Sequence, residues 1–232
     1  MVQFFFPVIA VLSFGPALLM LYYSLSKYTW PKSDKAYFDD RWIFGLLAVG
    51  IIVGTIFIYV EDVTAAGGGG FLLIILFTVI QELIVLVVLN FPRLRRKGGG
   101  RFYGYSLGTA IAAGIALGEY GIVFSGSSGF NIPTLLILLV YTFGLEILGG
   151  ATGSIIGYSI ESGTISRGIA VAVSLLVIYN FLLVPVFSFR PSYLTMLFDI
   201  ASLVLASAVY VILLLKVLPL QLGEVVGRKR LM

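Results

Sequence analysis

Four acidic residues lie inside long apolar segments of the chain, where a charged side chain is costly. They are Glu82, Glu119, Glu146 and Asp199. No Lys or Arg lies at a comparable depth to neutralise them, so we expect some of them to be protonated and to face the interior of a helical bundle. Buried carboxyls of this kind form hydrogen bonds between helices, act as general acid or base, or relay protons.

The chain contains no histidine and no cysteine. Zinc sites in proteins depend on these two residue types, and so do the Ser–His and Cys–His nucleophilic mechanisms. We therefore expect no metal and no other cofactor. The glycine runs 67–70 and 98–100 lack the Lys and Ser/Thr of a phosphate-binding loop, and we interpret them as linkers.

Small residues recur four positions apart within several apolar segments, a spacing typical of close helix–helix contacts in membranes. The spacing is consistent with packing inside the bundle and with docking of another membrane protein. Glu146 is expected to project from the glycine face of its helix, and Asp199 from a similar small-residue face. The residues concerned are Gly149, Gly153 and Gly157, then Ala110, Gly114 and Gly118, and finally Ser202 and Ala206.

The composition places these residues in a membrane. Of the 232 residues, 59% are hydrophobic and only 11% are charged, and the mean hydropathy is +1.08. Such values exclude an ordinary soluble fold, a disordered chain and a coiled coil, and a net charge of +4 does not suggest a nucleic-acid binder. We predict an all-α bundle of seven transmembrane helices, forming one integral membrane domain over residues 1–232 of a multi-pass cell-membrane protein. The predicted spans are 4–25, 42–60, 71–90, 102–124, 134–160, 168–187 and 193–218.

The basic residues are strongly segregated between the connections of this bundle. Alternate connections and the C-terminal end carry 14 of the 15 Lys and Arg residues, and the remaining one is Arg190. The positive-inside rule places the 14 in the cytoplasm. The N-terminus is therefore predicted to lie outside and the C-terminus in the cytoplasm.

Residues 81–121 read QELIVLVVLNFPRLRRKGGGRFYGYSLGTAIAAGIALGEYG. This stretch resembles the PrsW-type intramembrane proteases, which carry Glu-Glu-x-x-Lys in one helix, Gly-Phe-x-x-x-Glu-Asn in the next and His-x-x-x-Asn in a later one. The family positions that match are Glu82, Gly114, Glu119 and Asn180. The family positions that differ are Gln81, Val85, Ile115, Tyr120 and Leu176. The resemblance implies an intramembrane peptidase, but the metal-binding histidines of that family are missing.

The chain also resembles the scaffold subunit of gamma-secretase, a member of the same wider superfamily that has no protease activity of its own. The resemblance rests on Phe14-Gly15-Pro16-Ala17 in the first span, on Gln81-Glu82 in the third and on the predicted topology. The paired histidines of that subunit are missing here as well. This resemblance implies a pseudoenzyme that binds other membrane proteins.

Three functions remain open. The first is a non-catalytic scaffold or adaptor that binds the transmembrane helices of partner proteins, possibly within an intramembrane protease complex, and the missing histidines and lysine favour it. The second is an active peptidase in which Glu82 or Glu119 is the general acid or base and Gln81 or Asn180 holds the carbonyl oxygen. The third is a small proton-coupled transporter, although the sequence shows no internal repeat. The expected partners are the lipid bilayer and other integral membrane proteins, not nucleic acid.

Overall fold

The computed structural model describes residues 2–28, 37–65, 70–95, 98–125, 132–188 and 193–219. Within these ranges the chain is all-helical and has no strand, which confirms the predicted class. Seven helices are long and apolar enough to cross a membrane, as predicted. They are α1 (Val2–Leu25), α2 (Asp40–Ala65), α3 (Gly70–Leu89), α5 (Gly100–Ser125), α6 (Ile132–Ser162), α7 (Ile165–Ser188) and α8 (Tyr193–Ile212).

Three shorter helical elements complete the fold. A 3-10 turn, η1 (Ser26–Tyr28), follows α1, the single turn α4 (Pro92–Arg95) lies between α3 and α5, and a π-helical segment, η2 (Leu213–Val217), extends α8. Several helices are longer than the apolar spans, because a continued helix keeps its backbone groups hydrogen-bonded near the membrane surface. Glu61 and Asp62 therefore lie in the last turns of α2 and not in a connection.

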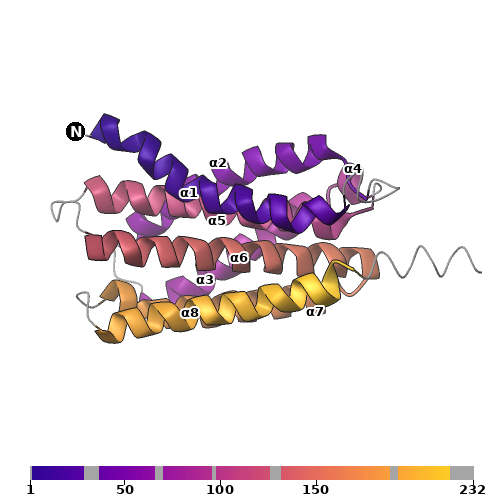
Figure 1. The fold of residues 1–232 in the computed structure, drawn as a ribbon. Helices are drawn as coiled ribbons and strands as arrows, with labels where there is room; N and C mark the ends of the chain where they lie inside the picture. Colours follow the sequence, from indigo (N-terminus) through magenta and orange to yellow (C-terminus); the bar gives the residue numbers. More distant parts are fainter. Residues whose placement is uncertain are drawn as a thin grey trace, which may run out of the picture.

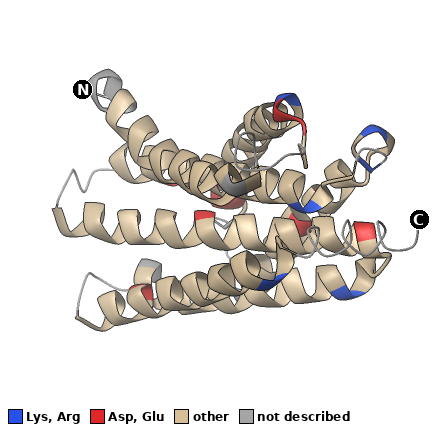
Figure 2. Ribbon diagram, turned by 45° about the vertical axis from the view of Figure 1, so that its right-hand side comes forward, with Lys and Arg blue, Asp and Glu red and all other residues tan. Residues whose placement is uncertain are grey.

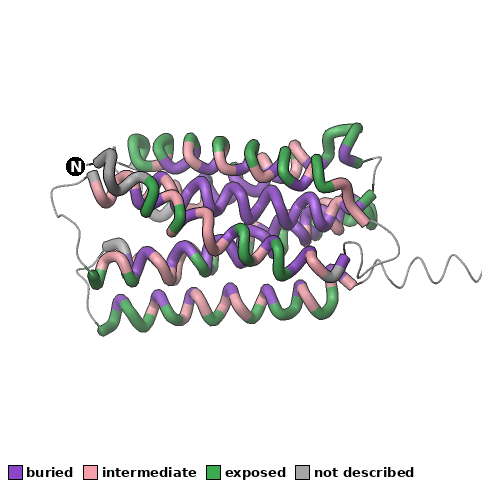
Figure 3. Tube along the Cα trace, turned by 45° about the horizontal axis from the view of Figure 1, so that its top comes forward, coloured by how far each residue is buried: buried purple, intermediate pink, exposed green. Residues whose placement is uncertain are grey.

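Helices α5 and α6 form the centre of the bundle (Figure 1). Every residue from 101 to 116 of α5 is buried, and the buried positions gather along the central helices (Figure 3). Helices α1 and α2 pack on α5, while α7 and α8 pack on α6 and on each other. Helix α3 lies at the edge of the bundle, against α7, α6 and α5, and it makes few contacts with α2.

Glycines allow α5 and α6 to approach each other closely. The two helices run antiparallel, and their glycines face one another as Gly100 with Gly157, Gly104 with Gly153, and Gly108 with Gly149. A Cβ atom on Gly104 or Gly153 would overlap the carbonyl oxygen of the facing glycine. Only glycine fits there, because the two backbones are in direct contact.

A second close contact joins α2 to α5. Gly114 of α5 lies against the backbone of Ile51, and Gly118 lies against the side chain of Ile58. On the α2 side, Gly54 faces the carbonyl of Ile111. The small-residue faces of α5 and α6 are thus covered by helices of the same chain.

The described basic side chains lie at one end of the bundle (Figure 2). We call this the basic end, and its residues are Arg41, Arg93, Arg95, Arg101, Arg167 and Lys216. The N-terminus of α1 lies at the opposite end (Figure 1). This separation matches the alternation of charge along the sequence.

Candidate functional site

The carboxyl group of Glu82 points from α3 into the interface with α6. The residue is only 1% exposed, and its Oε1 lies 2.9 Å from the hydroxyl of Thr152. The same hydroxyl lies 3.1 Å from the carbonyl oxygen of Gly149. A threonine hydroxyl has one proton to donate. Both contacts are satisfied when Glu82 is protonated and donates to the hydroxyl, which in turn donates to the carbonyl.

Asn180 joins the same region from α7. Its Nδ2 donates to the hydroxyl of Thr78 at 2.9 Å, and that hydroxyl donates to the carbonyl of Ile74 at 2.7 Å. Thr78 lies one turn before Glu82 on α3, so α7 contacts α3 through Asn180 one turn away from the contact of Glu82 with α6. Together, Glu82, Thr78, Thr152 and Asn180 form a polar cluster among α3, α6 and α7, which we call the α3 cluster. Gln81 is also buried, but it lies about 100° around the helix from Glu82.

Glu119 lies elsewhere in the bundle. Its electrostatic neighbours are Glu61 and Asp62 of α2, and it also acts on Tyr141 of α6. Tyr141 is 11 residues before Thr152, the residue that contacts Glu82, so the α6 neighbours of the two carboxyls are about 16 Å apart along the helix. The structure therefore does not bring Glu82 and Glu119 into one site.

Glu146 lies on the face of α6 that packs against α5. It is fully buried, and neither carboxylate oxygen has a hydrogen-bond partner among the residues the structure describes. One turn earlier, Thr142 contacts the hydroxyl of Tyr120 at 3.4 Å. An unpaired charge at this position would be very costly, whereas a neutral acid is less so. Gly149 and Gly153 lie against Gly108 and Gly104 of α5, and the projection of Glu146 from that glycine face stays a prediction.

Asp199 of α8 is nearly as deeply buried, and its Oδ1 has no partner within the described part of the chain. Tyr179 of α7 lies within electrostatic range of both Asp199 and Glu146. The Tyr179 hydroxyl donates to the backbone carbonyl of Tyr141 at 3.0 Å. Three helices, α6, α7 and α8, thus meet around two acids and a tyrosine.

Sequence reasoning assigned Arg101 to a connection, but the structure buries it. Arg101 is 1% exposed and lies in the first turn of α5, where its guanidinium contacts Glu161 of α6 at 3.0 and 3.1 Å. It also donates to the carbonyl of Val217 in η2 at 3.0 Å. Glu161 uses its other oxygen to accept the backbone N–H of Gly100 at 2.5 Å. This network joins three helices at the basic end, and no local sequence signal reveals it, because the partners are 60 and 116 residues away.

The donor set suits hydrogen bonding and proton transfer better than metal binding. Across the described ranges, no group of three or more His, Cys, Asp or Glu side chains is placed to hold a metal ion. Comparison of the chain with protein-family models, with curated proteins and with solved structures gives no significant match.

Proposed function

We propose that this multi-pass membrane protein is a non-catalytic scaffold that binds the transmembrane helices of a partner protein. We further propose that it resides in the cell membrane with its basic end in the cytoplasm and its N-terminus outside. The segregation of Lys and Arg supports this orientation.

The observation that carries the proposal is an apolar groove between α1 and α2. Both helices pack on α5 but barely on each other, and this leaves a groove of about 140 Å³ with no polar surface. Its floor consists of Ala110 and Ala113 of α5, and its walls include Phe14 and Ala17 of α1. Small residues on a membrane-facing surface let a further helix approach closely.

The same groove contains two of the residues that carry the resemblance to the gamma-secretase scaffold subunit. Phe14 and Ala17 of the Phe14–Ala17 motif line it. At Gly15 within that motif, no other described residue comes within 4 Å of the position a Cβ would take, apart from its chain neighbours and the backbone of its own helix. The glycines of α5 are packed against other helices of the bundle, whereas Gly15 leaves space that a partner helix can fill.

Two open glycines make a matched test of partner binding. Gly15→Leu places a side chain beside the groove. Gly45→Leu adds the same side chain to α2, where no described residue of another helix comes within 4 Å of a Cβ. Both variants are expected to fold, because neither added Cβ meets a residue of a neighbouring helix. Gly15→Leu should lose a co-purifying membrane protein in mild detergent, and Gly45→Leu should retain it.

Site-specific crosslinking identifies the contact directly. A photoreactive amino acid at Leu18, which lines the groove and is 49% exposed, should crosslink to a partner protein in cells. The same amino acid at Val87 of α3, which is 69% exposed, should label lipid only. Equal protein crosslinking at the two positions would contradict a specific groove.

The second candidate function is an intramembrane peptidase, and the α3 cluster is the observation that favours it. Asn180 of α7 contacts Thr78, which lies one turn before Glu82 on α3, and the two side chains would serve as a carbonyl-binding amide and an acid–base group. In that case Glu82→Gln would reduce cleavage of a co-expressed membrane substrate by about 10²–10⁴-fold. The control is Glu146→Gln, which removes a buried carboxyl from a different interface.

The scaffold predicts instead that wild type shows no cleavage and that Glu82→Gln keeps its partner. Metal analysis of the purified protein adds an independent measurement. We expect no stoichiometric zinc, because the chain has neither histidine nor cysteine. One zinc per chain that disappears in Glu82→Gln would favour the peptidase.

A further inference from the structure

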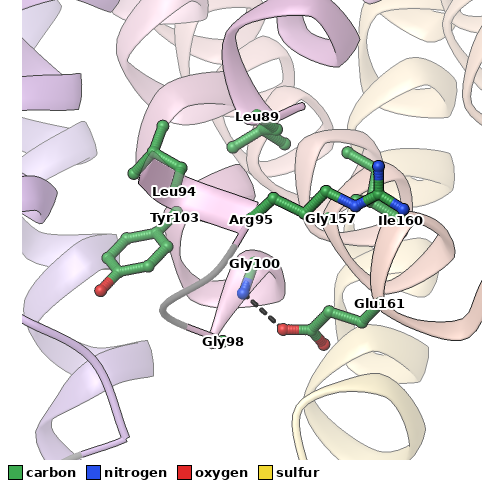
Figure 4. A pocket seen from close by; sticks show the side chains of 9 residues that line it. All are labelled: Leu89, Leu94, Arg95, Gly98, Gly100, Tyr103, Gly157, Ile160 and Glu161. Atoms are coloured by element: carbon green, nitrogen blue, oxygen red, sulfur yellow. Dashed lines mark hydrogen bonds between the residues drawn. The ribbon is translucent and has the colours of Figure 1, made fainter. Parts of the chain in front are cut away.

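A cavity of about 180 Å³ lies at the basic end, where α3 ends and α5 begins (Figure 4). The short helix α4, the start of α5 and the last turns of α6 enclose it. This volume is about six times the volume that one molecule occupies in liquid water, so the cavity has room for a group the size of a phosphate. It is distinct from the α3 cluster and from the groove between α1 and α2.

The cavity has an apolar wall and a charged rim. Leu89 and Leu94 are buried and, together with Ile160, form apolar surface at the level where α3 ends. The guanidinium of Arg95 reaches across the cavity from α4 toward α6 (Figure 4). A lining of this kind is suited to a ligand with an anionic group next to a hydrocarbon part.

The charge balance of the rim also favours an anion. Glu161 is the acidic residue of the lining, and both of its oxygens are occupied, one by the Gly100 N–H and the other by Arg101. Arg101 is neutralised in this pair. The backbone N–H of Arg95 donates to the carbonyl of Phe91, but its guanidinium has no ion pair or hydrogen bond with the residues that the structure describes, and none of these residues neutralises its charge at the rim.

We propose that this cavity binds the phosphate of an anionic phospholipid from the leaflet at the basic end of the bundle. Arg95 contacts the phosphate, and the first acyl carbons lie along Leu89 and Ile160. Basic pockets between transmembrane helices on the cytoplasmic side are suited to anionic headgroups. The site does not depend on the proposed partner protein, and a failure of either proposal leaves the other intact.

Native mass spectrometry of the full chain in detergent tests the proposal, with dioleoyl phosphatidylglycerol and dioleoyl phosphatidylcholine as probes. We expect one saturable phosphatidylglycerol site and weaker binding of phosphatidylcholine. Arg95→Gln should weaken phosphatidylglycerol binding about fivefold, the loss expected for one basic residue at a membrane surface.

Arg93→Gln is the matched control. It removes the same charge from the same turn, but Arg93 does not line the cavity, so the affinity should change by less than about twofold. Ile160→Phe provides a second variant that fills the cavity without changing its charge, and it should also weaken binding. All three proteins are compared only after their melting temperatures are shown to match wild type within a few degrees.

Three results would overturn the proposal. Equal losses in Arg93→Gln and Arg95→Gln would show general attraction to a basic surface. Equal binding of the two lipids would remove the preference for an anion. Displacement of phosphatidylglycerol by millimolar sodium phosphate would assign the cavity to a soluble anion.

Discussion

Substitution of Gly149 by alanine tests whether the α5–α6 contact holds the bundle together. A Cβ at this position would lie 2.8 Å from the carbonyl oxygen of Gly108 and 3.1 Å from the Cβ of Ala112. Ordinary contacts begin at about 3.4 Å, so the two backbones must move apart by about 0.6 Å at this level. Because the facing pairs Gly104–Gly153 and Gly100–Gly157 follow on one side of this point, a local separation also loosens those turns.

The expected loss follows from two opposing effects. Overpacking of a close contact costs about 1–3 kcal/mol, while alanine gains up to about 1 kcal/mol over glycine as a helix former. The net destabilisation is therefore about 1–2 kcal/mol. For a chain of this size each kcal/mol corresponds to about 2–4 °C in melting temperature, so Gly149→Ala should melt about 2–8 °C below wild type.

Gly45→Ala is the control for this experiment. A Cβ at Gly45 meets no described residue of another helix within 4 Å, so the same substitution brings the helix-propensity gain without the clash. The assay is thermal unfolding in detergent, followed by the loss of the monodisperse peak in size-exclusion chromatography. Equal melting temperatures for Gly149→Ala and Gly45→Ala would refute the claim that backbone contact between α5 and α6 limits stability.

Three further substitutions probe the polar contacts by the same assay. Thr152→Val removes the hydroxyl next to Glu82 and leaves the carboxyl without a partner, so the free energy of unfolding should fall by about 1–3 kcal/mol. Thr152→Ser should be close to wild type in stability. Glu161→Gln should destabilise the folded protein by about 3 kcal/mol, since it leaves the buried Arg101 charge uncompensated. An unchanged melting temperature would show that water replaces the ion pair. Ser24→Ala should lower the free energy of unfolding by about 1 kcal/mol, because its hydroxyl bridges two tyrosine hydroxyls of α5 and α8 at 3.0 and 2.7 Å. A loss of similar size in Ser26→Ala, at a half-buried serine two residues away, would contradict this.

The number and class of the helices follow from hydropathy alone, because a bilayer admits few alternatives for long apolar segments. The helices that each helix packs against do not follow from hydropathy. The spacing of Gly149, Gly153 and Gly157 indicates a contact face on α6, but nothing in it identifies α5 as the helix that covers that face. The facing glycines of α5 lie about 50 residues earlier in the chain.

In the candidate site, too, the sequence predicts the residue types but not their tertiary contacts. Family motifs drew Glu82 and Glu119 together in the sequence analysis, yet the structure separates them along the bundle axis. The partner that does contact Glu82 is Thr152, which no motif includes. The sequence places Arg101 at the end of a basic, glycine-containing connection, and its ion pair with Glu161 depends on tertiary structure.

The position of α3 at the edge of the bundle has a consequence for biosynthesis. Membrane helices are synthesised in chain order, and α3 packs mainly against α7 and α6, which follow it. During that interval Glu82 is in the bilayer without Thr152, at a cost of several kcal/mol if charged. Helix α3 is also the most apolar of the seven, with a mean hydropathy of 2.9 against 1.6 for the central helix α5. Its surplus of aliphatic side chains keeps the nascent helix inserted until the helices that receive its carboxyl have been made.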